Sequence, residues 1–108
     1  MEVDCSDMDI ALLVGIICPL PKRVSIKVVS RVVSYCRKGG FVIVSAALKR
    51  MLVEDPVTCF VMHFIGWRLS YKEESEVEEI ISRSGLIQRG LFYDHKRKFH
   101  LITVGQKI

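Results

Sequence analysis

The chain has 108 residues, a formal net charge of +4 and 50% hydrophobic residues. This length allows one domain with a single core, and the apolar content excludes a disordered chain. The longest apolar runs, residues 10–18 and 57–67, are shorter than the ~20 residues that cross a bilayer, so no membrane contact is expected. The first nine residues carry four acids, whereas a signal peptide begins with basic residues. The expected location is the cytoplasm.

Residues 9–17 are predicted to form the first strand. After Asp9 the stretch "IALLVGII" contains only apolar residues and glycine, and Pro19 and Pro21 follow it closely. This pattern is typical of a strand buried on both faces in the middle of a parallel sheet. Few residues precede this strand, so we expect its leading edge to lie bare unless another chain segment pairs with it.

A helix and a second strand follow. Polar residues recur at spacings of three and four between residues 23 and 38, and valines occupy the positions between them, which predicts an amphipathic helix beginning near Pro21. The pair Gly39 and Gly40 is interpreted as its C-terminal cap. The apolar stretch 41–48 is the predicted second strand, and the two strands should be parallel, as in a βαβ unit.

Two further helices are expected. Glu54, Asp55 and Pro56 mark a helix start before an apolar stretch that ends near residue 67, and a helix so apolar should be buried or covered by a partner. The acidic segment 73–84 should present Val77, Ile80 and Ile81 to the core and end at Gly85. Its start has capping-box spacing between Ser70 and Glu73.

The end of the chain predicts an antiparallel hairpin. The segments "LIQRGLFYD" and "KFHLITVGQK" flank a polar turn at residues 94–97.

In this order the parts resemble the C-terminal half of a class I S-adenosylmethionine-dependent methyltransferase. The segments that carry the resemblance are "MDIALLVGII", "CRKGGFVIVSAAL", "EVEEIISRSGL" and "FHLITVGQK", and together they span nearly the whole chain. The resemblance implies an α/β fold, a partial Rossmann-like sheet in the order β-α-β-(α)-α-β-β. It implies two parallel strands plus a C-terminal antiparallel hairpin, with the last strand inserted between the second and third.

The resemblance also implies that residues 1–108 form one incomplete domain. The family binds its cofactor mainly in its first half, through a glycine-rich loop and an acid after the second strand, and the present sequence contains neither ahead of Asp9. S-adenosylmethionine is therefore expected only if a complementary N-terminal half is present.

Within this chain, the resemblance places cofactor contacts at Val14, Gly15 and Ile16, after the first strand. Gly15 either allows a close backbone approach or relieves crowding against a helix. The substrate side would be formed by five residues spread over the chain: Cys18, Arg50, Glu54, His63 and Trp67.

Each of these candidates also has a structural interpretation. His63 is a weak candidate for a catalytic base, because imidazole can take a proton near neutral pH, but a lone His in an apolar helix is more often a hydrogen-bonded core residue. Trp67 suits packing as well as stacking, and Glu54 suits a helix N-terminus. Cys18 could be a nucleophile only beside a His or a helix N-terminus.

The remaining signals are less specific. The four cysteines have no metal or redox spacing, so no metal is expected, and three of them lie in apolar stretches as buried thiols would; an interchain disulfide or a reactive thiol stays open. Nucleic-acid binding is an alternative suggested by two groups of basic residues: residues 23, 27, 31, 37 and 38, and the cluster 95–98. No interleaved aromatic residues or zinc spacing support it, and a solvated face is the simpler interpretation.

We therefore expect the C-terminal portion of a methyltransferase-like protein, inactive as an isolated chain. The alternatives are a non-catalytic oligomerisation or interaction module and, with less support, a small basic nucleic-acid-binding protein. Expected partners are a second copy or a separate N-terminal half, docked through the exposed edge of strand 9–17. The apolar helix near residues 60–64 could add contact surface.

Overall fold

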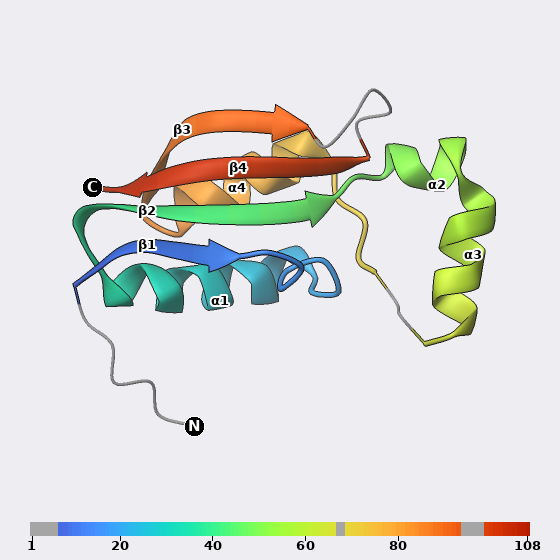
Figure 1. The fold of residues 1–108 in the computed structure, drawn as a ribbon, viewed down its shortest axis with the longest axis horizontal. Helices are drawn as coiled ribbons and strands as arrows, with labels where there is room; N and C mark the ends of the chain where they lie inside the picture. The colour runs from blue at the N-terminus through green and yellow to red at the C-terminus, as the bar shows by residue number, and fades with distance from the viewer. Residues whose placement is uncertain (1–6, 67–68, 94–98) are drawn as a thin grey trace.

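A four-stranded mixed sheet with two helices on one face forms the body of the chain (Figure 1). The computed structural model describes residues 7–66, 69–93 and 99–108. Its elements, in chain order, are β1 (Met8–Leu13), α1 (Lys22–Tyr35), β2 (Cys36–Ala47), α2 (Arg50–Glu54), α3 (Pro56–Phe64), α4 (Glu74–Arg83), β3 (Leu86–Tyr93) and β4 (His100–Lys107).

The strand order is β1-β2-β4-β3. β1 and β2 are parallel, and β4 is antiparallel to both β2 and β3. The last strand therefore lies between the second and third strands of the chain, which confirms the predicted insertion. The predicted turn at residues 94–97 lies outside the described residues.

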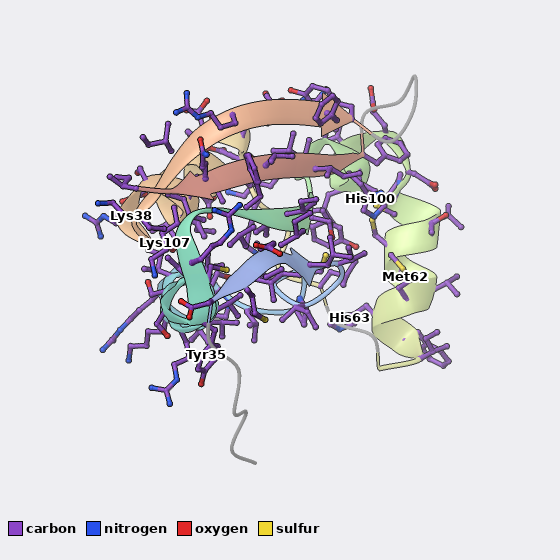
Figure 2. The ribbon with its side chains drawn as sticks, turned by 60° about the vertical axis from the view of Figure 1, so that its left-hand side comes forward. Tyr35, Lys38, Met62, His63, His100 and Lys107 are labelled. Atoms are coloured by element: carbon purple, nitrogen blue, oxygen red, sulfur yellow. The ribbon has the colours of Figure 1, made fainter. Side chains whose placement is uncertain are left out.

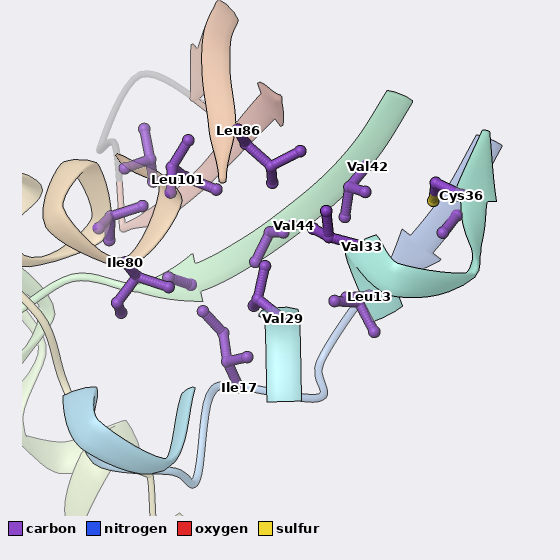
Figure 3. Close-up of a cluster of buried hydrophobic side chains, with 14 of the residues drawn as sticks. Leu13, Ile17, Val29, Val33, Cys36, Val42, Val44, Ile80, Leu86 and Leu101 are labelled. Atoms are coloured by element: carbon purple, nitrogen blue, oxygen red, sulfur yellow. The ribbon is translucent and has the colours of Figure 1, made fainter. Parts of the chain in front are cut away.

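The core lies between the sheet and the helices α1 and α4 (Figure 3). Alternate residues of each strand point into it, among them Leu13, Val44 and Leu101, and the helices contribute Val29 and Ile80. The predicted inward face of α4 is confirmed, because Val77, Ile80 and Ile81 are all buried. Three-residue and four-residue spacing places these side chains on one side of the helix.

The opposite face of the sheet is bare among the described residues, so the prediction of a strand buried on both faces is wrong. β1 ends at Leu13 and not near residue 17. Ala11 and Leu13 are buried, whereas Ile10 is 59% exposed and Leu12 is 65% exposed. The physical reason is that β1 is an outer strand and that α1 and α4 cover only one side of the sheet.

The glycine pair does not cap α1. The helix ends at Tyr35, and Cys36 already has extended backbone angles. Gly39 and Gly40 lie inside β2, where the pairing with β1 shifts register between Met8 and Ile10. A Cβ at position 40 would come within 3.0 Å of the Met8 carbonyl oxygen, so glycine here permits close contact between the two backbones. Of the predicted basic helical stripe, residues 37 and 38 consequently belong to a strand.

The caps of the later helices match the sequence only in part. Asp55 caps α3 by accepting a hydrogen bond from the Thr58 amide at 3.3 Å, as the Glu54-Asp55-Pro56 pattern predicts. The prediction of a capping box at the start of α4 is wrong. Glu73 is the N-cap residue and forms no side-chain cap bond, and the Ser70 amide donates to the Cys18 carbonyl instead.

α2 and α3 lie beyond the carboxyl ends of β1 and β2, at one end of the molecule (Figure 1). A small second core of Met51, Cys59 and Phe99 holds them to the body. The outward residues of α3 are apolar and exposed, with Val57 at 71% and Phe64 at 80%. Within the described chain this helix is therefore not buried, and its cover by a partner stays a prediction. No helix among the described residues is both long enough and apolar enough to span a membrane.

Candidate functional site

The segment after β1 runs along the end of the sheet where open α/β folds bind ligands. Val14, Gly15 and Ile16 are all exposed there. The Gly15 amide donates to the Ser45 hydroxyl of β2 at 2.9 Å. Gly15 has a φ of +74°, and a Cβ at this position would meet no atom within 4 Å. The crowding interpretation is therefore wrong, and glycine is favoured here by its backbone angle.

Lys72 holds the next part of this segment, at Ile17, through a hydrogen bond to its backbone. Its side chain is fully buried, and its Nζ donates to the carbonyl oxygens of Ile17 at 2.8 Å and Ser70 at 2.9 Å. Burial lowers the pKa of the Lys72 ammonium, while the nearby Cys18 and Glu76 act in the opposite direction. Because this lysine lies in the polar stretch "SYKEES", its sequence gives no sign that it is buried.

A polar cavity of about 360 Å³ lies between the end of β2 and the start of α4. Arg50 is paired there with Glu74, and the Tyr93 hydroxyl donates to the same carboxylate at 2.7 Å. This hydrogen bond raises the pKa of Tyr93. Lys49 lies 3.7 Å from Glu73, so each acid of the cavity lining is paired with a base. The lining residues are Leu48, Lys49, Arg50, Lys72, Glu73, Glu74 and Ser75.

A second, apolar pocket of about 270 Å³ lies between the α2–α3 pair and the segment that leads to α4. It contains His63, whose imidazole projects from α3 towards the body of the molecule (Figure 2). Burial and a side-chain hydrogen bond with Cys59 raise the pKa of Tyr71 to about 12. The lining residues are Leu52, Pro56, Cys59, Phe60, His63, Leu69 and Tyr71.

The structure does not bring the predicted substrate residues into one cluster. Arg50 lines the polar cavity and His63 lines the apolar pocket, while the exposed Glu54 lines neither. Cys18 is buried behind the Lys72 contacts. Trp67 lies outside the described residues. Sequence reasoning missed Lys72, Glu74 and Tyr71, which lie in or beside a polar segment with no motif.

The described thiols are structural. Cys18, Cys36 and Cys59 are free and buried, and each Sγ lies within 3.9 Å of a backbone carbonyl oxygen. Burial raises the pKa of the Cys36 thiol, which disfavours the reactive thiolate. Among the described residues, no group of three or more His, Cys, Asp and Glu side chains is placed to hold a metal ion.

Comparison with known proteins identifies the fold. No family model and no curated protein matches the sequence. Among solved structures, magnesium protoporphyrin IX methyltransferase from Synechocystis PCC 6803, solved with bound SAH, superposes with a TM-score of 0.71 at 15% identity, over 95% of this chain and 46% of that one. The chain has a class I methyltransferase-like fold.

Two further structures extend this result. A putative O-methyltransferase from Nostoc punctiforme PCC 73102 gives a TM-score of 0.70 at 15% identity, over 95% of this chain and 33% of that one. A SAM-dependent methyltransferase from Methanosarcina mazei gives 0.70 at 8% identity, over 99% and 63%. The present chain thus spans less than two thirds of each of these structures, and the methyltransferase-like fold is represented in part.

Proposed function

We propose that the chain supplies the C-terminal portion of a SAM-dependent methyltransferase-like domain and is inactive by itself. The observation that carries this proposal is the half-covered sheet. Among the described residues no strand pairs with the outer edge of β1, and one face of the sheet is apolar and exposed at Ile10 and Leu12. A strand as apolar as β1, paired in parallel with its neighbour, is normally covered on both faces.

The residues present do not form a complete cofactor site. The cofactor of the matched enzymes would border Val14, Gly15 and Ile16, which contribute one exposed segment. The one adjacent pair of glycines in the chain, Gly39 and Gly40, lies within β2 and not at a turn from a strand into a helix. A phosphate- or methionine-cradling loop needs glycines at such a turn. No methyl-transfer step is therefore assigned to this chain alone.

The proposed partner supplies what the sheet lacks. It contributes a strand parallel to β1 and apolar side chains that cover Ile10 and Leu12. A separate N-terminal half would complete the cofactor site. Arg50 and His63 line separate cavities, so the substrate side is placed at the His63 pocket alone. In that complete domain His63 is the side chain best placed in a pocket to accept a proton from a substrate.

Isothermal titration of S-adenosylmethionine into the isolated chain tests the proposal. We expect no micromolar binding, because one wall of a site gives few contacts. Micromolar binding by this chain would contradict the incomplete-site proposal. The control is a far-UV circular dichroism spectrum of the same sample. If the spectrum shows helix and strand, the absence of binding does not result from an unfolded chain.

The bare sheet also favours a second function, that of a non-catalytic interaction module. In this case two copies pair through the edges of β1 across a twofold axis. The described basic residues give less support to nucleic-acid binding, because several are engaged within the chain. Arg37 lies 2.5 Å from Asp9, Lys22 lies 2.9 Å from Glu79, and Arg31 lies over the Tyr35 ring.

A further inference from the structure

The sheet has an outer face, turned away from α1 and α4, that is apolar across all four strands. Residues directly opposite each other in neighbouring strands point to the same side, so the register assigns this face position by position. The rows that cross it from β1 to β3 are Ile10, Phe41, Gln106 and Ile87, then Leu12, Ile43, Val104 and Gly90, and finally Ser45, Ile102 and Phe92. None of these positions carries a charged side chain.

The exposed part of the outer face is large enough for a weak protein interface. Ile10, Leu12, Ile87 and Phe92 keep between 42% and 65% of their surface exposed, and the other members are half-buried. At on the order of 150 Å² for a large side chain, these four residues expose roughly 350 Å². The half-buried members bring the area towards the ~600 Å² that each partner buries in the smaller stable interfaces.

The outer face is complementary to itself when two copies lie face to face. A twofold axis between the sheets and parallel to the strands places β1 over β3 of the other copy, and β2 over β4. Leu12 then lies opposite Gly90, over which the Phe92 ring leans, and Ile102 lies opposite Ser45. Large side chains that face small ones allow two layers to interdigitate.

We infer that two copies of this chain pack the outer faces of their sheets together, with β1 of each copy over β3 of the other. The contact needs neither S-adenosylmethionine nor an N-terminal half, so the inference goes beyond the proposed function. Pairing through the edges of β1 is a different contact, because it extends the sheet sideways and leaves the outer face exposed. The uncharged face favours a second uncharged face over a nucleic acid, whose charge would lose its hydration there.

A matched pair of lysine variants on β3 tests the face contact. Ile87 lies on the outer face and is 42% exposed, whereas Leu91 is 39% exposed and lies on the inner side, opposite the buried Thr103. In sedimentation equilibrium we expect the wild-type chain to dimerise with a dissociation constant on the order of 10–100 μM. Ile87→Lys should raise this constant at least tenfold, and Leu91→Lys should leave it within twofold. Urea unfolding of both variants shows that each is folded.

Intermolecular NOEs locate the contact directly. Within one chain, Leu12 and Phe92 lie on the two outer strands, about 14 Å apart at ~4.8 Å per strand. The inferred dimer brings the Leu12 methyl groups of one copy to the Phe92 ring of the other. In a mixture of isotope-labelled and unlabelled chains, above the dissociation constant, we expect isotope-filtered NOEs between these two side chains. Pairing through the edges of β1 would instead connect Leu12 to β1 of the other copy.

Three results would each overturn the inference. The first is a wild-type chain that stays monomeric at its highest soluble concentration. The second is equal dimerisation of wild type and Ile87→Lys, which would assign the contact to the edge of β1. The third is an equal loss from Ile87→Lys and Leu91→Lys, which would assign it to the edge of β3. None of these results bears on cofactor binding, and micromolar binding of S-adenosylmethionine would contradict the proposed function while leaving the face contact unaffected.

Discussion

Lys72 places an ammonium group where the chain excludes water. Its Nζ has two carbonyl partners, Ile17 and Ser70, and no carboxylate within salt-bridge distance among the described residues. Carbonyl oxygens stabilise the ammonium less than an ion pair would, so burial dominates and lowers the pKa. The same contacts hold the segment after β1 against the segment before α4. One buried side chain thus joins the two stretches that border the candidate site.

This placement predicts a pH dependence of stability. Between the lowered pKa of folded Lys72 and its ordinary value of 10.5, the unfolded chain binds more protons than the folded chain. The free energy of unfolding should therefore rise with pH in this window, by at most about 1.4 kcal/mol per pH unit. Lys72→Met should abolish this contribution. Urea unfolding of both proteins at pH 7, 8, 9 and 10 measures it.

The comparison of variants isolates Lys72 from other groups. The raised pKa values of Tyr71, Tyr93 and Cys36 produce the opposite slope at alkaline pH, but they are present in both proteins. Lys27→Met, on the exposed side of α1, is the matched control and should keep the wild-type slope. Parallel profiles for wild type and Lys72→Met would show that the lysine titrates normally.

The pairing of β1 with β2 depends on a glycine rather than on a side chain. A Cβ at Gly40 would lie 2.9 Å from the Arg37 carbonyl oxygen and 3.0 Å from that of Met8, and backbone atoms cannot rotate away. At Gly105 the three atoms nearest to a Cβ all belong to the side chain of Leu86, which can shift in part. An added methyl group should therefore be tolerated less well at Gly40 in β2 than at Gly105 in β4.

We expect Gly40→Ala to lower the free energy of unfolding by about 2–3 kcal/mol, at the upper end for overpacking, with Gly105→Ala costing less. Urea unfolding compares the two variants, and amide hydrogen exchange in β1 shows where protection is lost. Equal destabilisation by both variants would mean that the close approach of the two backbones is not the limiting contact.

Sequence reasoning predicted helices and strands correctly where a residue pattern is compatible with only one local structure. Asp55 before Pro56 predicts a helix cap, and the spacing of Val77 and Ile80 predicts the inner face of α4; both are confirmed. It failed where one pattern serves two structures. Two glycines after an amphipathic helix suit a helix cap and a strand irregularity equally well. The burial of Lys72 was missed because it depends on contacts 55 residues away.

The candidate site was harder to predict than the fold. The order of strands followed from the resemblance, and the structure confirms it. Arg50 and His63 were expected on one substrate side, but the structure places them in separate cavities. Arg50 begins α2 and His63 lies in α3, and the cavity that each side chain lines depends on tertiary packing, which hydrophobic periodicity does not encode. Apolar residues in β1 likewise indicate the environment that they prefer, not the one that this chain provides.

Within the part of the chain that the structure describes, β1 has both an unpaired outer edge and an exposed apolar face. Leu12 and Leu13 are neighbours in β1, but Leu12 is 65% exposed and Leu13 is 7% exposed. They form a matched pair for the proposal that this surface receives a partner. A lysine at an edge strand opposes pairing through its charge, whereas a lysine in a core leaves a buried charge unpaired.

We expect the wild-type chain to associate as its concentration rises and Leu12→Lys to remain monomeric, with its free energy of unfolding within about 0.5 kcal/mol of wild type. Leu13→Lys should lose more than about 3 kcal/mol, a large share of the stability of a domain this small. Sedimentation velocity over a range of concentrations and urea unfolding measure the two effects. A wild-type chain that stays monomeric at high concentration would exclude self-pairing through β1. Similar destabilisation by both lysines would show that the face bearing Leu12 is covered by the chain itself, and the half-covered sheet would then no longer support a missing partner.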